Sequence, residues 1–137
     1  MRELIFVAVG GSIGAAARYG AGLAAARWLG KGFPWSTLAV NVAGCFLMGI
    51  VMEIMLNLEA KTGLPQPAES DLASSFWRHG VAIGFLGALT TFSAFGADTI
   101  RQMQSGQQLT ALANIAANVA LSLAAVWCGV ILMRAIN

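Results

Sequence analysis

The residues of this chain best placed to do chemistry are polar side chains that interrupt long apolar stretches. Residues 84–95 read Gly-Phe-Leu-Gly-Ala-Leu-Thr-Thr-Phe-Ser-Ala-Phe, inside an apolar run long enough to cross a membrane. The glycines and the Thr90-Thr91 pair weaken a helix where lipid offers no replacement hydrogen bonds. Irregular backbone at membrane depth persists only when it is buried in protein or lines a polar cavity. We therefore predict a broken helix here and expect a permeation or ion-binding site at the break.

Two phenylalanines follow this break at helical spacing. Phe92 and Phe95 are three residues apart, so both rings project from nearly one face of a helix. Such pairs commonly serve in core or lipid-facing packing, but Thr91 and Ser93 beside them are unusual for simple lipid contact. Because an aromatic ring has a positive edge, ring edges can also face an anion while excluding bulkier solutes. The sequence leaves both interpretations open.

Neutral polar side chains also lie in two other apolar stretches. Asn41 needs partners or water, because an unsatisfied polar group in hydrocarbon costs several kcal/mol. Asn114, Asn118 and Ser122 are spaced i, i+4 and i+8, which predicts one polar stripe along a helix. Neutral donors can pass a small anion along without trapping it, since conduction needs binding that is favourable but weak. The alternative for Asn41 and for the stripe is hydrogen bonding that only holds the helices together.

Charged residues inside the apolar stretches are few. Arg18 interrupts a row of small residues at every fourth position, and a charge within a span usually faces a cavity or a partner. We expect Arg18 to have an anchoring role, the alternative being that its side chain extends to the interface. Glu53 lies near the end of its apolar stretch, and we expect it to reach water.

The elements that must position these residues are four membrane-spanning helices in one domain, residues 1–137. Of the 137 residues 58% are hydrophobic and 10% charged, whereas soluble domains contain about 25% charged residues. A span needs roughly 20 apolar residues, and we place spans at about residues 4–26, 36–58, 77–100 and 109–132. A polar loop, Glu59–Ser75, separates the second and third spans. The fold class is an all-α membrane protein, and we expect no cleaved signal peptide because the first apolar run continues past Arg18.

The charge distribution excludes some functions and leaves orientation open. Scattered basic residues and a net charge of +2 argue against nucleic-acid binding, and a single histidine cannot build a zinc site. Cys45 and Cys128 are expected to be small core residues. Lys and Arg are nearly balanced between the two ends of the predicted spans, so the usual bias that fixes orientation is weak. The chain is thus expected to insert both ways, or else in one orientation through features not visible in the sequence.

Three motifs in order resemble the Fluc family (also called CrcB) of bacterial fluoride channels. They are Gly10-Gly11-x-x-Gly14-Ala15-x-x-Arg18-Tyr19, Trp35-Ser36-Thr37-Leu38-x-x-Asn41-x-x-Gly44, and Gly84-Phe85-Leu86-Gly87-Ala88-Leu89-Thr90-Thr91-Phe92-Ser93-x-Phe95. The resemblance covers all four spans. It implies passive, fluoride-selective export across the inner (cell) membrane of a bacterium, which lowers cytoplasmic fluoride. It implies no enzyme activity.

The same resemblance implies an assembly and a set of site residues. The assembly is an antiparallel, dual-topology homodimer in membrane lipid, with two fluoride pores and a structural sodium ion at the dimer centre. The backbone carbonyls of Gly87 and Thr90 match the sodium ligands. Arg18 matches the arginine that ends the first helix. The implied fluoride pathway comprises Asn41, Thr91, Phe92, Ser93 and Phe95, to which the stripe of Asn114, Asn118 and Ser122 is added.

The chain departs from the family pattern at three positions. Asp98 stands where the family often has a glutamate, Asn114 aligns with a tyrosine, and Asn118 with a serine. The route of the ion past the fourth helix is therefore open, and Asp98 is expected to be structural.

Two other functions remain as alternatives. A small four-span coupled exporter, of the fluoride/proton or multidrug type, would want an acid in the first span, where only Glu3 occurs near the terminus. A structural membrane subunit would explain the small residues but not the polar ones.

Overall fold

The computed structural model describes residues 1–30, 32–62 and 72–136, and every regular element in these ranges is helical. The elements are α1 (Arg2–Trp28), α2 (Trp35–Thr62), α3 (Leu72–Ser75), η1 (Phe76–Leu86), α4 (Gly87–Leu89), α5 (Phe92–Gln104) and α6 (Gln108–Ile136). Four segments are long and apolar enough to cross a membrane: Arg2–Trp28, Trp35–Ala60, Leu72–Gln104 and Gln108–Ile136. The prediction of an all-α protein with four such helices is confirmed, and each predicted span falls within one of these segments.

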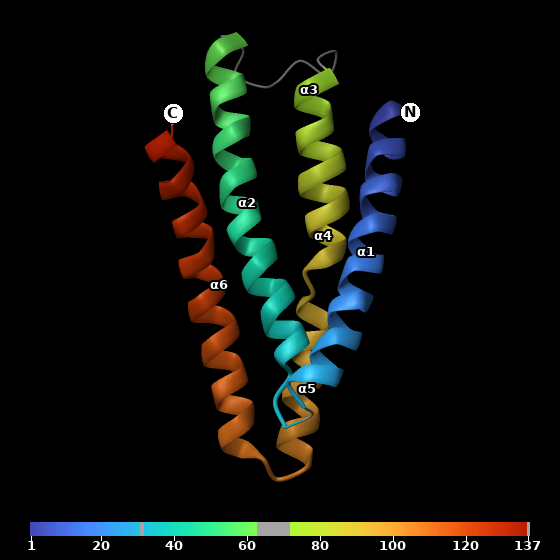
Figure 1. Ribbon diagram of the computed structural model, residues 1–137, viewed down its shortest axis with the longest axis vertical. Coiled ribbons are helices and arrows are strands. Elements are labelled where there is room, and N and C mark those ends of the chain that lie inside the picture. Colours follow the sequence, from blue (N-terminus) through green and yellow to red (C-terminus); the bar gives the residue numbers. More distant parts are fainter. Residues whose placement is uncertain (31, 63–71, 137) are drawn as a thin grey trace.

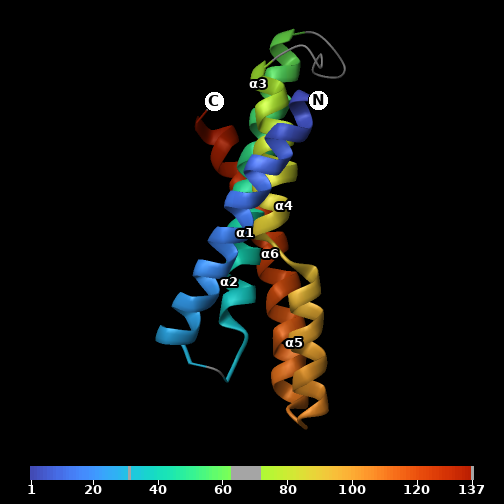
Figure 2. The same cartoon turned by 90° about the vertical axis from the view of Figure 1, so that its right-hand side faces the viewer.

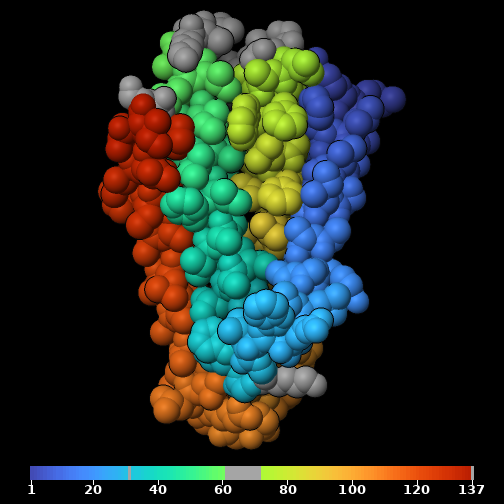
Figure 3. All heavy atoms as spheres, viewed as in Figure 1, coloured from blue at the N-terminus to red at the C-terminus, as the bar shows by residue number. Residues whose placement is uncertain are grey.

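The four segments form an elongated bundle (Figure 1). α1 begins and α6 ends at the same end of it, as an even number of spans requires. α2 runs along the middle of one face, between α6 on one side and η1 on the other (Figure 3). α1 packs on η1 and α4, and α5 packs on α6. In the other half of the bundle α1 and α5 diverge (Figure 2).

Glycines end two of the helices. Gly30 follows α1 and Gly106 follows α5, each with a φ of 78°. This left-handed conformation is the usual one just past a helix end, and glycine adopts it without the steric cost of a Cβ. Both turns therefore depend on residues that the sequence places where the apolar stretches stop.

The third apolar segment is the least regular. Its first part, η1, is a π-helix, which the sequence analysis did not predict. After Leu89 the backbone becomes extended at Thr90 (φ −77°, ψ 155°) and Thr91 (φ −152°, ψ 114°), and helix resumes at Phe92. Gly84 and Gly87 lie within the helical parts. The extended residues are thus the threonines and not the glycines.

Small residues let the helices approach closely at two crossings. A Cβ on Gly10 would overlap the carbonyl oxygen of Gly80, and one on Gly14 would overlap that of Phe85. On the other side of the bundle, a Cβ on Gly49 would overlap the carbonyl oxygen of Val126. Backbone contact of this kind replaces the hydrophobic effect as the source of helix association in lipid. Gly22 has nothing within 4 Å of its Cβ position, so the row of small residues packs only along its first half.

Three expectations from the sequence need correction. The loop expected over Glu59–Ser75 is shorter, because α2 continues to Thr62 and α3 begins at Leu72; residues 63–71 lie outside the described part. Cys45 is half-buried but Cys128 is exposed, so Cys128 is not a core residue of the single chain. Glu53 does not extend into water: it is 8% exposed and pairs with Arg134 of α6 at 3.1 Å. Arg134 lies in the last turn of α6 and reaches the Glu53 carboxylate on α2.

Candidate functional site

A pocket of about 250 Å³ lies where α2 and α6 meet the extended residues of the third segment. Its lining combines hydroxyls, amides and aromatic rings, which come from Asn41, Cys45, Thr90, Thr91, Phe92, Phe95, Asn118, Val119 and Ser122. Six of the eight residues predicted for the fluoride pathway are therefore brought together around one space, with Thr90 of the predicted sodium pair. All of these residues lie in segments long and apolar enough to cross a membrane.

The two phenylalanine rings are neighbours at the edge of this pocket. Their centroids lie 5.4 Å apart with an interplanar angle of 56°, a tilted arrangement in which one ring presents its edge. Phe92 is 83% exposed in the single chain, whereas Phe95 is half-buried. A ring this exposed is available to contact a partner helix or an ion that enters the pocket.

Thr91 and Asn41 together hold the extended segment in place. Asn41 Oδ1 accepts the Thr91 backbone N–H at 2.8 Å, and Asn41 Nδ2 donates to the Thr91 carbonyl at 3.3 Å. Thr91 is also the N-cap of α5, because its Oγ1 accepts the N–H of Ala94 at 3.1 Å. Gly44 completes the arrangement, since a Cβ there would overlap Cγ2 of Thr90. Residues of α2 thus supply both the space and the hydrogen bonds that the extended backbone needs.

Two carbonyls beside the extended residues lose their helical donors. In a continuous helix the N–H of residue i+4 bonds the carbonyl of residue i. The N–H groups of Thr91 and Ala94 instead donate to Asn41 and to the Thr91 hydroxyl. The carbonyl oxygens of Gly87 and Thr90 are therefore released from the helical pattern. Gly87 is also exposed on the surface of the chain.

The polar stripe of α6 divides into an inner and an outer part. Asn118 and Ser122 line the pocket, but Asn114 is fully buried behind them. Ser122 Oγ is buried and has no hydrogen-bond partner among the described residues. Ser93 is exposed and lies 3.2 Å from Thr91 through their hydroxyls. The stripe predicted from the i, i+4, i+8 spacing thus faces the interior of the chain at one end and the pocket at the other.

Arg18 and Asp98 lie in the half of the bundle where α1 and α5 diverge. Arg18 is half-buried and shares a cavity of about 200 Å³ with Thr37 and Thr91. Within the described residues its guanidinium has no hydrogen-bond or ion-pair partner. Asp98 joins α2 to α5, because its Oδ2 accepts from Thr37 Oγ1 at 2.8 Å and its Oδ1 pairs with Arg101 at 3.1 Å.

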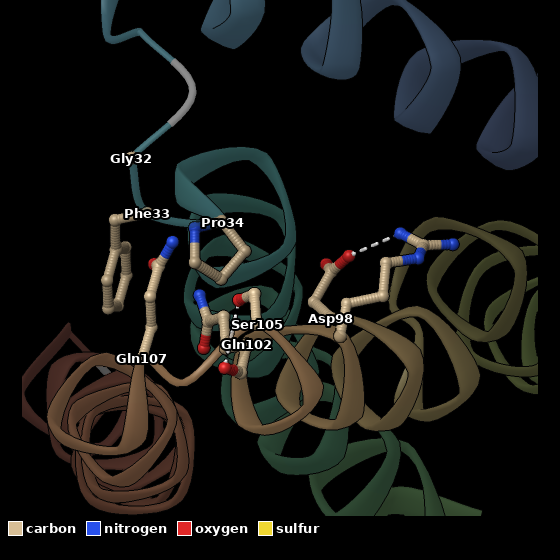
Figure 4. A pocket seen from close by; sticks show the side chains of 8 residues that line it. Gly32, Phe33, Pro34, Asp98, Gln102, Ser105 and Gln107 are labelled. Atoms are coloured by element: carbon tan, nitrogen blue, oxygen red, sulfur yellow. Dashed lines mark hydrogen bonds and ion pairs between the residues drawn. The ribbon is translucent and has the colours of Figure 1, made fainter.

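A larger polar pocket of about 360 Å³ opens beside Asp98 (Figure 4). Phe33 and Pro34 of the turn before α2 face Gln102 and Gln107 across it. The dashed line that begins at Asp98 in Figure 4 marks its ion pair with Arg101. The two charged residues that line this pocket, Asp98 and Arg101, are paired with each other. The pocket therefore offers no unpaired charge to bind an ion.

Sequence reasoning missed three residues of the site. Cys45 and Val119 line the pocket, and Thr99, only 6% exposed, bonds Asn114 at 2.9 Å. The spacing could have revealed Cys45, which is four residues after Asn41 and so on the same helix face. It could not have revealed Thr99, whose role depends on how α5 and α6 pack.

Comparison with known proteins supports one family over nearly the whole chain. The family described as "CrcB-like protein, Camphor Resistance (CrcB)" matches residues 5–130. Two similar proteins, from Rhizobium etli and Rhizobium johnstonii, are 42% and 43% identical over 136 residues, which is 99% of each chain. A third, from Geobacter metallireducens, is 39% identical over 134 residues, or 98% of each chain. All three are named "Fluoride-specific ion channel FluC". The resemblance drawn from the three motifs is confirmed, and the chain belongs to the CrcB-like family of multi-pass membrane proteins.

Proposed function

We propose that the protein is a fluoride-selective channel that lets fluoride leave the cell passively, and not an enzyme. The observation that carries this proposal is the pocket at Thr91, where neutral donors and two phenylalanine rings gather in a chain whose relatives bear the name of fluoride channels. Neutral hydrogen fluoride enters a cell from acidic surroundings and ionises inside. The channel provides the exit for fluoride, driven by the negative potential of the cell interior. The membrane concerned is the cell (inner) membrane of a bacterium.

The chemistry of the pocket suits a small anion that must give up its water. Fluoride holds water strongly, so the site must offer donors as the ion dehydrates. The hydroxyl of Ser122 has no competing partner among the described residues, and the hydroxyls of Thr91 and Ser93 lie beside the rings. The N-terminus of α5, which begins at Phe92, adds backbone N–H groups and the positive end of a helix dipole. No fixed positive charge lines the pocket, so binding stays weak enough for release.

The proposed assembly is an antiparallel dimer of this chain with two pores. The exposed ring of Phe92 and the exposed Gly87 favour a partner surface at the extended residues. The balance of Lys and Arg between the two ends favours insertion in both orientations, which an antiparallel pair requires. Each pore would then be built from both subunits, with the pocket of one chain closed by the other.

A structural sodium ion fits the carbonyls beside the extended residues. Hard cations bind oxygen ligands, and interrupted helices bind ions in membrane proteins through freed backbone groups. Gly87 and Thr90 supply two such carbonyls, whose helical donors are engaged elsewhere. In the proposed dimer the second chain supplies the same pair. The ion would hold the two interrupted helices together and its charge would favour an anion nearby. Dimers that remain equally heat-stable when a bulky organic cation replaces sodium throughout purification would contradict this role.

The function is tested by fluoride efflux from liposomes containing the purified protein, followed with a fluoride electrode. We expect fluoride to leave and chloride to be retained. Phe92→Ile should sharply reduce fluoride efflux, because an aliphatic side chain has no positive edge to present to the ion. Phe76→Ile is the matched control, since Phe76 contacts Phe6 and Trp77 away from the pocket. Equal efflux from Phe92→Ile and wild-type protein would remove this ring from the mechanism, and no fluoride efflux from wild type would refute the function.

A further inference from the structure

Three asparagines, one of α2 and two of α6, form one continuous hydrogen-bonded chain with a threonine of α5. Asn41 Nδ2 donates to Asn118 Oδ1 at 2.9 Å, and Asn118 Nδ2 donates to Asn114 Oδ1 at 2.8 Å. Asn114 Nδ2 donates to Thr99 Oγ1 at 2.9 Å, and the Thr99 hydroxyl donates to the Phe95 carbonyl at 2.8 Å. Every donor points the same way, from the extended residues toward the interior of α5. Such a chain polarises its members cooperatively.

Backbone groups, which cannot change roles, fix this direction. The N–H of Thr91 can only donate, so the side-chain atom of Asn41 that faces it must be the oxygen. The Asn114 carbonyl can only accept, so the Asn118 atom 3.1 Å away must be the nitrogen. The Phe95 carbonyl takes the only proton of the Thr99 hydroxyl, so Thr99 can accept from Asn114 but not donate to it. Reversing any one amide would therefore place two donors or two acceptors face to face.

The two amides that line the pocket donate all their protons to acceptors within the protein. Both partners of Asn41 Nδ2, the Thr91 carbonyl and Asn118 Oδ1, are acceptors within the protein. Both partners of Asn118 Nδ2 belong to Asn114. An amide nitrogen carries two protons, so neither residue has a donor left for an ion. The hydroxyl of Ser122, in contrast, lines the same pocket with no partner among the described residues.

The inner members of this hydrogen-bonded chain expose little or no surface at which water could replace a lost partner. Asn114 is 0% exposed, Asn118 5% and Thr99 6%. Removing one partner in such a place leaves a buried polar group unsatisfied. The acceptor that Asn118 offers to Asn41 is thus held in place through Asn114 by Thr99, which lies three hydrogen bonds from Asn41.

We propose that Thr99, Asn114 and Asn118 are positioning residues for conduction: they hold in place the Asn41 side chain that bonds Thr91, while hydroxyls and ring edges, not these amides, contact the ion. The proposal rests on the proposed function, because it assigns roles within the same pathway. It refines the interpretation of the α6 stripe as a row of donors, and it adds Thr99, which no motif indicated.

The test compares Thr99→Val with Thr99→Ser in the liposome efflux assay. Valine keeps the shape but removes the acceptor for Asn114, so fluoride efflux should fall roughly tenfold, as for outer partners of metal ligands. Serine restores the hydroxyl and should restore efflux to near the wild-type rate. Thr110→Val, on α6 and outside the chain of hydrogen bonds, is the matched control and should conduct normally.

A double variant distinguishes the effect of breaking the hydrogen-bonded chain from the effect of misfolding in Thr99→Val. In Thr99→Val/Asn114→Leu both partners of the Thr99–Asn114 link become apolar, so no unpaired group remains between these two side chains. Asn118 Nδ2 also loses Asn114 Oδ1 but keeps the Asn114 backbone carbonyl as an acceptor. The efflux of the double variant should also be reduced while the protein elutes as a dimer. Wild-type rates in this double variant or in Thr99→Val would overturn the inference, as would a Thr99→Ser variant as slow as Thr99→Val. Wild-type protein that passes no fluoride would instead overturn the proposed function, so the two failures are distinguishable.

Discussion

At the scale of single residues, the polar groups that line the pocket differ in whether they already have a hydrogen-bond partner within the described part of the protein. Asn41 and Asn118 are engaged with the protein, whereas Ser122 Oγ is buried and unpartnered within the described part of the chain. A buried hydroxyl without a partner costs stability, and such groups often mark a function. Ser122 is therefore the side chain of α6 best placed to donate to an anion.

Replacing Ser122 with Ala should separate function from stability. A hydrogen bond to a charged group contributes about 1.5–3 kcal/mol, so fluoride efflux should fall roughly tenfold or more. Unfolding of the detergent-solubilised protein should change little, because no bond within the described chain is lost. Ser12→Ala is the control on an exposed surface, where the hydroxyl bonds only the Val9 carbonyl. Normal efflux from Ser122→Ala would exclude its hydroxyl from the pathway.

At the scale of elements, close backbone contact fixes the third segment and so places the extended residues. α1 meets η1 and α4 through Gly10 and Gly14, whose Cβ positions are occupied by carbonyl oxygens of the neighbouring helix. On the opposite side of the bundle, α2 meets α6 through Gly49 and Gly129 in the same manner. The Glu53–Arg134 pair adds a polar link between α2 and α6 about one turn farther along α2 from Gly49. The helices carrying the pocket are thus held by contacts that tolerate no added methyl group.

Gly14→Ala should destabilise the protein while Gly20→Ala should not. The added methyl of Gly14→Ala meets the Phe85 carbonyl, which is backbone and cannot move aside alone, so the overpacking should cost about 1–3 kcal/mol. Gly20 has nothing within 4 Å of its Cβ position, and alanine favours a helix over glycine by about 1 kcal/mol. Thermal unfolding of both variants in detergent makes the comparison. Equal midpoints would show that α1 is not held by this contact.

At the scale of the whole molecule, the single chain leaves the proposed site open. The pocket is bordered by the exposed ring of Phe92, and Gly87, whose carbonyl is released from the helical pattern, is an exposed residue. The charges at the two ends of the spans do not select an orientation. These features agree with a second, oppositely oriented copy that completes the site.

Added lysines should therefore separate the two orientations. Ser105→Lys/Gln107→Lys should draw the turn between α5 and α6 to the cytoplasmic side, and Glu3→Lys/Ala135→Lys should draw the termini there, because positive charges near span ends are retained inside. C-terminal reporter fusions measure each orientation. Either variant alone should protect cells poorly against fluoride, whereas both expressed together should restore protection. Full protection by one fixed orientation would contradict the antiparallel dimer.

Composition and apolar run lengths determined the four spans, because a bilayer requires about 20 apolar residues per crossing whatever the fold. Spacing along each helix also placed Phe92 with Phe95 and Asn118 with Ser122, since helical periodicity is local. Only the tertiary structure decided which polar groups are hydrogen-bonded to one another. The bonds from Asn41 to Thr91 and to Asn118, and from Asn114 to Thr99, cross between helices. Whether a side chain offers a proton to an ion or to its neighbour depends on those crossings, and no local pattern encodes them.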